Sequence, residues 1–246
     1  MKHNFVIGNT TGKLGNIVAY VRGGEQFARA YQPVVLNPRT PRQQMSREKL
    51  LMASQLSRSM SVPIRVGFGQ EANGRVSARN IFTSKLIKSD VLVGQTPATL
   101  EIMYEELQIS DGKAGVYPFN MEESNFTTPL QVGFKIDSNF DPWEASHTSD
   151  GNSVDVALYL VVYNKSLGGC VFHTLFVKHK DSATWLIPDT AITVDVPGNW
   201  QGSYCETFAF TKQLPEALNG IAPDTLPYRY PGNSSKTQYC GAGRIA

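Results

Sequence analysis

Residues 154–163, with the sequence VDVALYLVVY, form a long run of strand-forming side chains, which limits the fold classes that this chain can adopt. Because successive residues of a strand point to opposite faces, Val156, Leu158 and Leu160 share one face, and Ala157 and Tyr159 share the other. Residues 170–177 have a second strand pattern, which can pair with the first across the loop NKSLGG. The two patterns predict a β-hairpin within a larger sheet.

Strand patterns continue through most of residues 96–246, where helix signals are almost absent. Residues 130–136 alternate apolar and polar side chains, which is typical of a strand with one buried face. Further short strands are predicted at ATWLI, at AITVDV, and where Tyr204, Phe208 and Phe210 share a face. About seven such strands, separated by Gly, Pro, Asn and Asp turns, favour an antiparallel β-sandwich of immunoglobulin or fibronectin type.

The N-terminal part predicts a hairpin. Residues 16–22 are rich in β-branched side chains, and residues 26–31 can return as the partner strand. Between them, Gly23 and Gly24 form a two-residue turn signal.

Helices are predicted next, beginning with a clear start signal. Thr40, Pro41 and Gln43 match the N-cap, the first helical position and the capping-box position of a helix over residues 41–60. A short helix up to Phe68 and another over residues 75–88 are also predicted. Met45, Met52, Leu56 and Met60 form one apolar stripe on the first helix, and the apolar residues of the last are Val76, Ile81, Leu86 and Ile87.

We therefore expect an α+β fold that is mainly β with an α-helical insert. Two domains are predicted: residues 1–95, a basic docking segment with the hairpin and two or three helices, and residues 96–246, the antiparallel β-sandwich.

The net charge of +2 conceals an asymmetry that supports this division. Residues 1–100 contain 14 Lys and Arg and 4 Asp and Glu, a net charge of +10. Residues 101–246 contain 9 Lys and Arg and 17 Asp and Glu, a net charge of −8. The basic part could bind nucleic acid, or it could contact the acidic part of a neighbouring copy, which we favour.

Residues 7–24, IGNTTGKLGNIVAYVRGG, raise the question of a phosphate-binding loop. A Walker A loop needs four residues between its first Gly and the Gly-Lys pair, and a Ser or Thr after the Lys. Here three residues separate Gly8 from Gly12, and Leu14 follows Lys13. The predicted continuation is a strand, whereas the phosphate site uses a helix N-terminus. We interpret the glycines as positions that allow tight turns and close backbone approach.

Metal sites and catalytic motifs are not supported. Cys170 and His173 would point to opposite faces of a strand. The loop over residues 137–150 begins like an EF-hand, but Pro142 replaces the required Gly and Thr148 replaces the bidentate Glu, so an ordinary acidic loop is favoured over a weakly held cation. The three cysteines are expected to be reduced thiols. We predict no enzyme activity and no cofactor.

Aromatic and basic side chains are interleaved on the predicted hairpin. Phe27, Arg29 and Tyr31 share one strand face, and Tyr20 and Arg22 share a face of the partner strand. Such faces can stack the bases of single-stranded nucleic acid, or the aromatics can pack on protein while the Arg stems cover apolar surface, which we favour. The candidate contact residues for assembly or nucleic acid are Lys13, Tyr20, Arg22, Phe27, Arg29, Tyr31, Arg39, Arg42 and Arg47.

Residues 8–50 resemble the N-terminal signature of a domain family of unknown function that is widespread in Bacteroidota and their phages. The matching positions are Gly8, Gly12, Lys13, Gly15, Gly24, Arg29, Asn37, Pro38, Thr40, Gln43 or Gln44, and Arg47. Towards the C-terminus, DVALYLVVYN and YCETFAF are similar to its paired strands. SKTQYCG is similar to its closing run, with Thr237 in place of a Ser.

The resemblance implies a virion context without catalytic residues, in which the basic segment docks into an assembly. The leading hypothesis is a non-enzymatic virion structural protein of a bacteriophage infecting Bacteroidota. It would be a capsid, capsid-associated or connector subunit, made in the host cytoplasm, and would assemble with copies of itself and other virion proteins.

Three alternatives stay open. The chain could be a nucleic-acid-binding virion protein that uses the basic segment on packaged DNA, a host-surface or glycan-binding spike, or a hydrolase with a dispersed site. No signal peptide is predicted, and no apolar window approaches the length of a membrane span.

Overall fold

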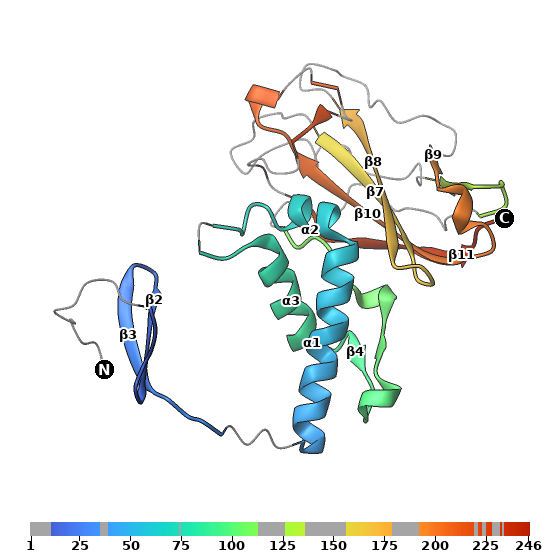
Figure 1. The fold of residues 1–246 in the computed structure, drawn as a ribbon. Coiled ribbons are helices and arrows are strands. Elements are labelled where there is room, and N and C mark those ends of the chain that lie inside the picture. The colour runs from blue at the N-terminus through green and yellow to red at the C-terminus, as the bar shows by residue number, and fades with distance from the viewer. Residues whose placement is uncertain are drawn as a thin grey trace. The chain divides into compact units, whose positions relative to one another are not determined.

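The computed structural model describes residues 11–34, 39–73, 75–112, 126–135, 156–178, 192–218, 221–222, 225–227, 232 and 234–246 (Figure 1). The chain divides into two compact units, residues 1–43 and residues 44–246. The described residues form a mixed α/β structure with three α-helices and antiparallel sheets. The strand predicted at ATWLI lies outside them.

The first unit contains a three-stranded antiparallel sheet in the order β1-β2-β3. Its strands are β1 (Gly12–Leu14), β2 (Ile17–Arg22) and β3 (Glu25–Ala30). Gly23 and Gly24 have φ values of 63° and 81°, as a two-residue turn with left-handed central residues requires. The predicted hairpin is therefore confirmed as β2 and β3, and β1 is an additional strand that the sequence patterns did not indicate.

The second unit begins with three helices, α1 (Pro41–Ser59), α2 (Ser61–Gly67) and α3 (Ala78–Lys88). The backbone N–H of Gln43 donates to the Thr40 hydroxyl at 3.4 Å, which confirms the predicted N-cap. The predicted capping box is not completed, because Gln43 Oε1 has no hydrogen-bond partner among the described residues. α3 starts three residues later than predicted because Ser77 is its N-cap and accepts a hydrogen bond from the Asn80 N–H.

The predicted helix faces are only partly correct. The apolar stripe of α1 packs into the core and continues just past the helix end: Met45, Met52, Leu56 and Met60. On α3 the buried residues are Ala78, Phe82 and Leu86. Val76, which was predicted to be part of the apolar face, lies before the helix and is 39% exposed.

A four-stranded antiparallel sheet, in the order β11-β10-β7-β8, forms the centre of the second unit (Figure 1). Its strands are β7 (Val156–Asn164), β8 (Gly169–Lys178), β10 (Tyr204–Gln213) and β11 (Gln238–Arg244). β7 pairs with β8 along its length, which confirms the hairpin predicted across NKSLGG. Every residue of β7 is buried.

The two faces of β7 belong to different cores. Tyr159 and Val161 pack in one cluster with the helices, and Leu158 and Leu160 pack in another with β6 (Gln131–Phe134) and β9 (Ile192–Asp195). β6 and β9 form a separate antiparallel pair. The second unit thus has three layers: helices, the four-stranded sheet and the β6–β9 pair.

An immunoglobulin-like sandwich is not confirmed, because α1, α2 and α3 cover the face of the sheet where such a fold has a second sheet. The nearly continuous apolar run of β7 shows that both of its faces are apolar, but it does not show which element covers each face. The shared core also explains why the second compact unit begins at residue 44 and not at residue 96, where the sequence analysis divided the chain.

Short elements lie in the connections between the helices and strands. β4 (Leu92–Val93) pairs with β5 (Glu101–Ile102), and 3-10 turns cover Pro97–Thr99, Tyr104–Glu106, Gly198–Trp200 and Glu216–Leu218. None of the described helices has the length and apolar character needed to cross a membrane.

Candidate functional site

The register of the N-terminal sheet sorts its side chains into two faces of different chemistry. Directly paired residues of antiparallel strands point to the same side. We call one side the aromatic–cationic face: Lys13, Val18, Tyr20, Arg22, Glu25, Phe27 and Arg29. The opposite side carries no charged residue, and we call it the aliphatic face: Leu14, Ile17, Ala19, Val21, Gln26, Ala28 and Ala30.

The aliphatic face is open to solvent. Leu14 is 77% exposed, Ile17 44% and Val21 39%, and none of the described residues from 11 to 34 is buried. Apolar side chains gathered on one side of a small sheet normally pack against another layer. Within the first unit, the described residues supply no layer that covers this face.

The aromatic–cationic face confirms and extends the predicted arrangement. The rings of Tyr20 and Phe27 stack with centroids 5.7 Å apart, and the Lys13 ammonium lies 3.6 Å from the centre of the Tyr31 ring. The two predicted strand faces are thus one and the same face. Because the rings pair with each other and with Lys13, the aromatic groups already have partners, which weakens the case for base stacking.

The remaining predicted contact residues lie outside this sheet. Arg39 precedes α1, and Arg42 and Arg47 lie on α1, where both are exposed. The structure therefore gathers six of the nine candidates around one sheet face. The role of all nine as contacts stays a prediction.

The glycine-rich stretch does not form a phosphate loop in its described part. Residues 12–14 are β1, and Gly15, with a φ of 60°, allows the tight turn into β2, as predicted. The predicted close backbone approach is wrong for Gly12 and Gly15, because a Cβ atom on either would meet nothing within 4 Å.

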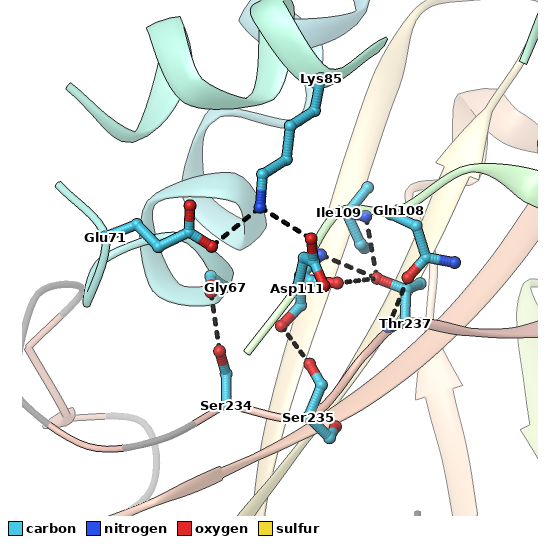
Figure 2. A network of polar contacts seen from close by, with 10 residues as sticks. Gly67, Glu71, Lys85, Gln108, Ile109, Asp111, Ser234, Ser235 and Thr237 are labelled. Atoms are coloured by element: carbon cyan, nitrogen blue, oxygen red, sulfur yellow. Dashed lines mark hydrogen bonds and ion pairs between the residues drawn. The ribbon is translucent and has the colours of Figure 1, made fainter. Parts of the chain in front are cut away.

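A polar network joins three segments that are distant in sequence (Figure 2). The Lys85 ammonium lies 2.9 Å from a Glu71 carboxylate oxygen and 2.7 Å from an Asp111 carboxylate oxygen. Burial alone would lower the pKa of Lys85, but the hydrogen bonds to Asp111 and Glu71 outweigh it, so the pKa is raised. Lys85 stays protonated and ties α3 to the residue 107–112 segment.

The closing run SSKT satisfies buried backbone groups of the same segment. The Thr237 hydroxyl oxygen accepts hydrogen bonds from the N–H groups of Ile109 and Ser110, both at 2.8 Å. The Ser110 hydroxyl donates to the Ser235 carbonyl at 2.6 Å. The partners in these contacts are more than 120 positions apart in the sequence. The contacts hold residues 109–110 against residues 235–237, which lead into β11 (Figure 2). Their function is to satisfy backbone groups that would otherwise be buried without partners.

Two side chains from the C-terminal half complete the end of α2. The Lys212 ammonium donates to the Val66 carbonyl at 3.0 Å, and the Ser234 hydroxyl donates to the Gly67 carbonyl at 2.8 Å. The last carbonyls of a helix lack intrahelical donors, and a cation is favourable at this end. Lys212 is only 1% exposed, and burial lowers its pKa to about 8.

Glu206 on β10 is a buried carboxylate with a perturbed pKa. It is 4% exposed, and it accepts a hydrogen bond from the Tyr239 hydroxyl at 2.8 Å, with the Lys165 ammonium 3.9 Å away. Burial raises the pKa of the carboxyl, while the Tyr239 hydrogen bond and the Lys165 charge oppose the rise. Such a group suits acid–base chemistry, but its contacts with Tyr239 and Lys165 tie β10 to β11 and to the turn after β7, which is a structural role.

The thiols and candidate metal ligands show no constellation among the described residues. Burial raises the pKa of Cys170 and Cys240 to about 12, and that of Cys205 to about 11, with the Glu206 charge contributing. Cys170 and His173 lie on opposite faces of β8, as predicted. No three His, Cys, Asp or Glu side chains of the described residues could together hold a metal ion. The acidic loop over residues 137–150 lies outside that part.

The patterns in the sequence did not indicate the structural roles of Lys85, Glu206, Lys212 and the closing Ser and Thr residues. Their partners lie between 14 and 167 positions away, so no local spacing marks them. The one available signal was the resemblance of SKTQYCG to a family run, which singled out Ser235 and Thr237 without saying what they do.

Comparisons with protein-family models, with curated proteins and with solved structures find no match for this chain. The resemblance described above therefore stays a prediction, and the function has to be argued from the features of the molecule itself.

Proposed function

We propose that this chain is a non-enzymatic structural subunit that assembles with other copies of itself through its N-terminal sheet, as a component of a bacteriophage virion. The observation that carries the proposal is the aliphatic face, an uncharged side of a three-stranded sheet with Leu14, Ile17 and Val21 exposed. A second copy that covers this face supplies the missing layer.

The energetic reason is the small size of the N-terminal sheet. An isolated two-stranded hairpin is marginally stable at best in water, and β1 adds only three residues to the hairpin of β2 and β3. Full burial of one Val, Leu or Ile side chain contributes roughly 1.5–3 kcal/mol. Covering Leu14, Ile17 and Val21 together would therefore stabilise the sheet and the assembly in a single step.

The polar side chains of the second unit support a structural protein over an enzyme. Lys212, Ser234 and Thr237 direct their polar atoms to backbone groups of neighbouring segments. Satisfying buried backbone groups accounts for these residues without any substrate.

The virion context rests on the resemblance of residues 8–50 and on the opposite charges of the two parts of the sequence, +10 and −8, which favour contacts between copies. Nucleic-acid binding by the aromatic–cationic face and recognition of host glycans stay alternatives. Detection of the protein in purified particles by mass spectrometry tests the context separately from the assembly mechanism.

The assembly mechanism is tested with two variants that each place a negative charge on a different face of β2. We expect the wild-type protein to form oligomers in sedimentation velocity at micromolar concentrations, and Val21→Glu on the aliphatic face to abolish them. Val18→Glu places the same charge on the opposite face of the same strand and should leave the oligomers intact. A wild-type protein that stays monomeric throughout, or equal effects of the two variants, would refute the proposal.

The folding of the second unit is the control for both variants. Its cores consist of residues from α1 onwards, so thermal unfolding of this unit should be the same in Val21→Glu, Val18→Glu and the wild type.

A further inference from the structure

A cavity of about 470 Å³ lies among α2, the start of α3 and the segment between them. Its volume is within the usual range for pockets that hold small ligands. The lining residues all lie between Ser61 and Asn80.

Three arginines, Arg65, Arg75 and Arg79, line this cavity, and no Asp or Glu is among the lining residues. The nearby carboxylate of Glu71 is occupied by Lys85 at 2.9 Å. Three like charges around one cavity repel each other, and an anion within the cavity converts this repulsion into attraction. The residues thus form a cationic pocket without a carboxylate counter-charge in its lining.

Arg79 is held in place from α1. Its Nε donates to the Ser57 hydroxyl at 3.0 Å, and one Nη donates to the carbonyl and the hydroxyl of Ser54 at 3.2 Å. Ser57 is buried, so this anchor is part of the packing between α1 and α3. All three arginines are exposed, and the hydrogen bonds to Ser54 and Ser57 hold the charge of Arg79 at the cavity wall.

The start of α3 adds to the positive potential of the pocket. α3 has 11 residues, its first turn contains no acidic side chain, and Ser77, Ala78, Arg79 and Asn80 all line the cavity. The N-terminal end of a helix carries about half a positive charge and N–H groups without intrahelical acceptors. Acidic residues are common there, but the first turn of α3 has Arg79 and no acidic residue, so this end of the helix favours an external anion.

We propose that this pocket binds a phosphate group. Arg65 and Arg75 supply planar forks that match phosphate oxygens, and Arg79 and the start of α3 supply fixed positive charge. Ala72 and Val76 provide apolar wall for the remainder of the ligand, and they explain why Val76 is not in the core. The phosphate is either free inorganic phosphate or a phosphodiester of a nucleic acid strand.

This inference does not rest on the proposed assembly function. All lining residues belong to the second unit, whereas the aliphatic face belongs to the first. Failure of one proposal therefore leaves the other standing.

The test uses the full chain and two probes, inorganic phosphate by calorimetry and a labelled single-stranded DNA oligonucleotide by fluorescence anisotropy. We expect Arg65→Ala and Arg75→Ala each to weaken binding by about ten-fold or more, the usual loss for one charge-assisted contact. Lys88→Ala is the matched control, because it removes one exposed positive charge from the last residue of α3, at the opposite end of that helix from the cavity. Arg79 is left unchanged because it also anchors α3 to α1.

Phosphate that binds without the oligonucleotide identifies a free-phosphate site, and an oligonucleotide that phosphate displaces identifies the phosphodiester as the ligand. Both results support the proposal if the two arginine variants weaken binding and Lys88→Ala does not. Absence of binding of either probe to the wild type at low salt overturns it. Equal losses in Lys88→Ala and Arg75→Ala also overturn it, because they indicate diffuse attraction to the basic surface.

Discussion

Replacing Lys212 by methionine should change how the stability of this protein depends on pH. The Lys212 ammonium is 1% exposed and donates to the Val66 carbonyl at 3.0 Å. Burial lowers its pKa from an ordinary value of 10.5 to about 8. Because one pKa unit corresponds to about 1.4 kcal/mol, the charged form of the buried side chain costs about 3 kcal/mol of stability at neutral pH.

The direction of the effect follows from where the proton is held. Between pH 8 and pH 10.5 the unfolded chain keeps the Lys212 proton while the folded protein releases it. The free energy of unfolding therefore rises with pH over this window, by about 3 kcal/mol in total. Below pH 8 both states hold the proton and the contribution is constant.

The difference between wild type and Lys212→Met isolates this contribution from other groups. The cysteines have raised pKa values and lower the stability of both proteins equally above about pH 9. The loss of the Val66 hydrogen bond is independent of pH once the variant has no ammonium. Urea unfolding at pH 7, 8, 9, 10 and 10.5 should show the wild type gaining about 3 kcal/mol relative to the variant.

Lys236 provides the control, since it is exposed and lies on the neighbouring part of the chain. Lys236→Met should run parallel to the wild type over the whole pH range. Parallel curves for Lys212→Met and wild type would refute the reasoning, because they would show that Lys212 is as well solvated in the folded protein as in the unfolded chain.

Three further outcomes are expected. Thr237→Val leaves the buried N–H groups of Ile109 and Ser110 without their acceptor and should lower the free energy of unfolding by about 2 kcal/mol or more. Thr237→Ser keeps the hydroxyl and should retain most of the wild-type stability. Equal losses for the two variants in urea unfolding would contradict the hydrogen-bond argument. Gly169→Ala places a Cβ 2.7 Å from the Trp200 ring and should cost about 1–3 kcal/mol, measured as a lowered Tm. Cys205 and Cys240, both buried with raised pKa values, should react with a thiol reagent at pH 8 only after unfolding; rapid labelling of the native protein would show that they are accessible.

Local signals in the sequence predicted the elements that depend on neighbouring residues. Gly23 and Gly24 indicated the turn between β2 and β3, because few other residues adopt positive φ at both positions. Thr40 and Pro41 indicated the start of α1, and the strand patterns around NKSLGG indicated β7 and β8. Each of these features is determined by residues that are close together in the sequence.

The candidate surface on the N-terminal sheet was partly predictable for the same reason. The alternation of Tyr20 with Arg22, and of Phe27 with Arg29, shows which side chains share a strand face. The turn sets the strand register, and this register places the two strand faces on the same side of the sheet, as the pairing of Tyr20 with Phe27 shows. The aliphatic face on the other side was not singled out, because Leu14 lies on a strand that the pattern did not indicate.

The tertiary structure alone decided what covers each face of β7 and how buried polar groups are satisfied. Tyr159 packs with the helices, and Leu158 packs with β6 and β9, although both belong to the same apolar run in the sequence. Lys212 completes the end of α2 from a position 146 residues away. The sequence by itself determined the β2–β3 and β7–β8 hairpins and the start of α1, since these follow from short-range sterics and hydrogen bonding. Burial, layer order and the cationic pocket depend on which distant segments meet, and that is settled only when the whole chain packs.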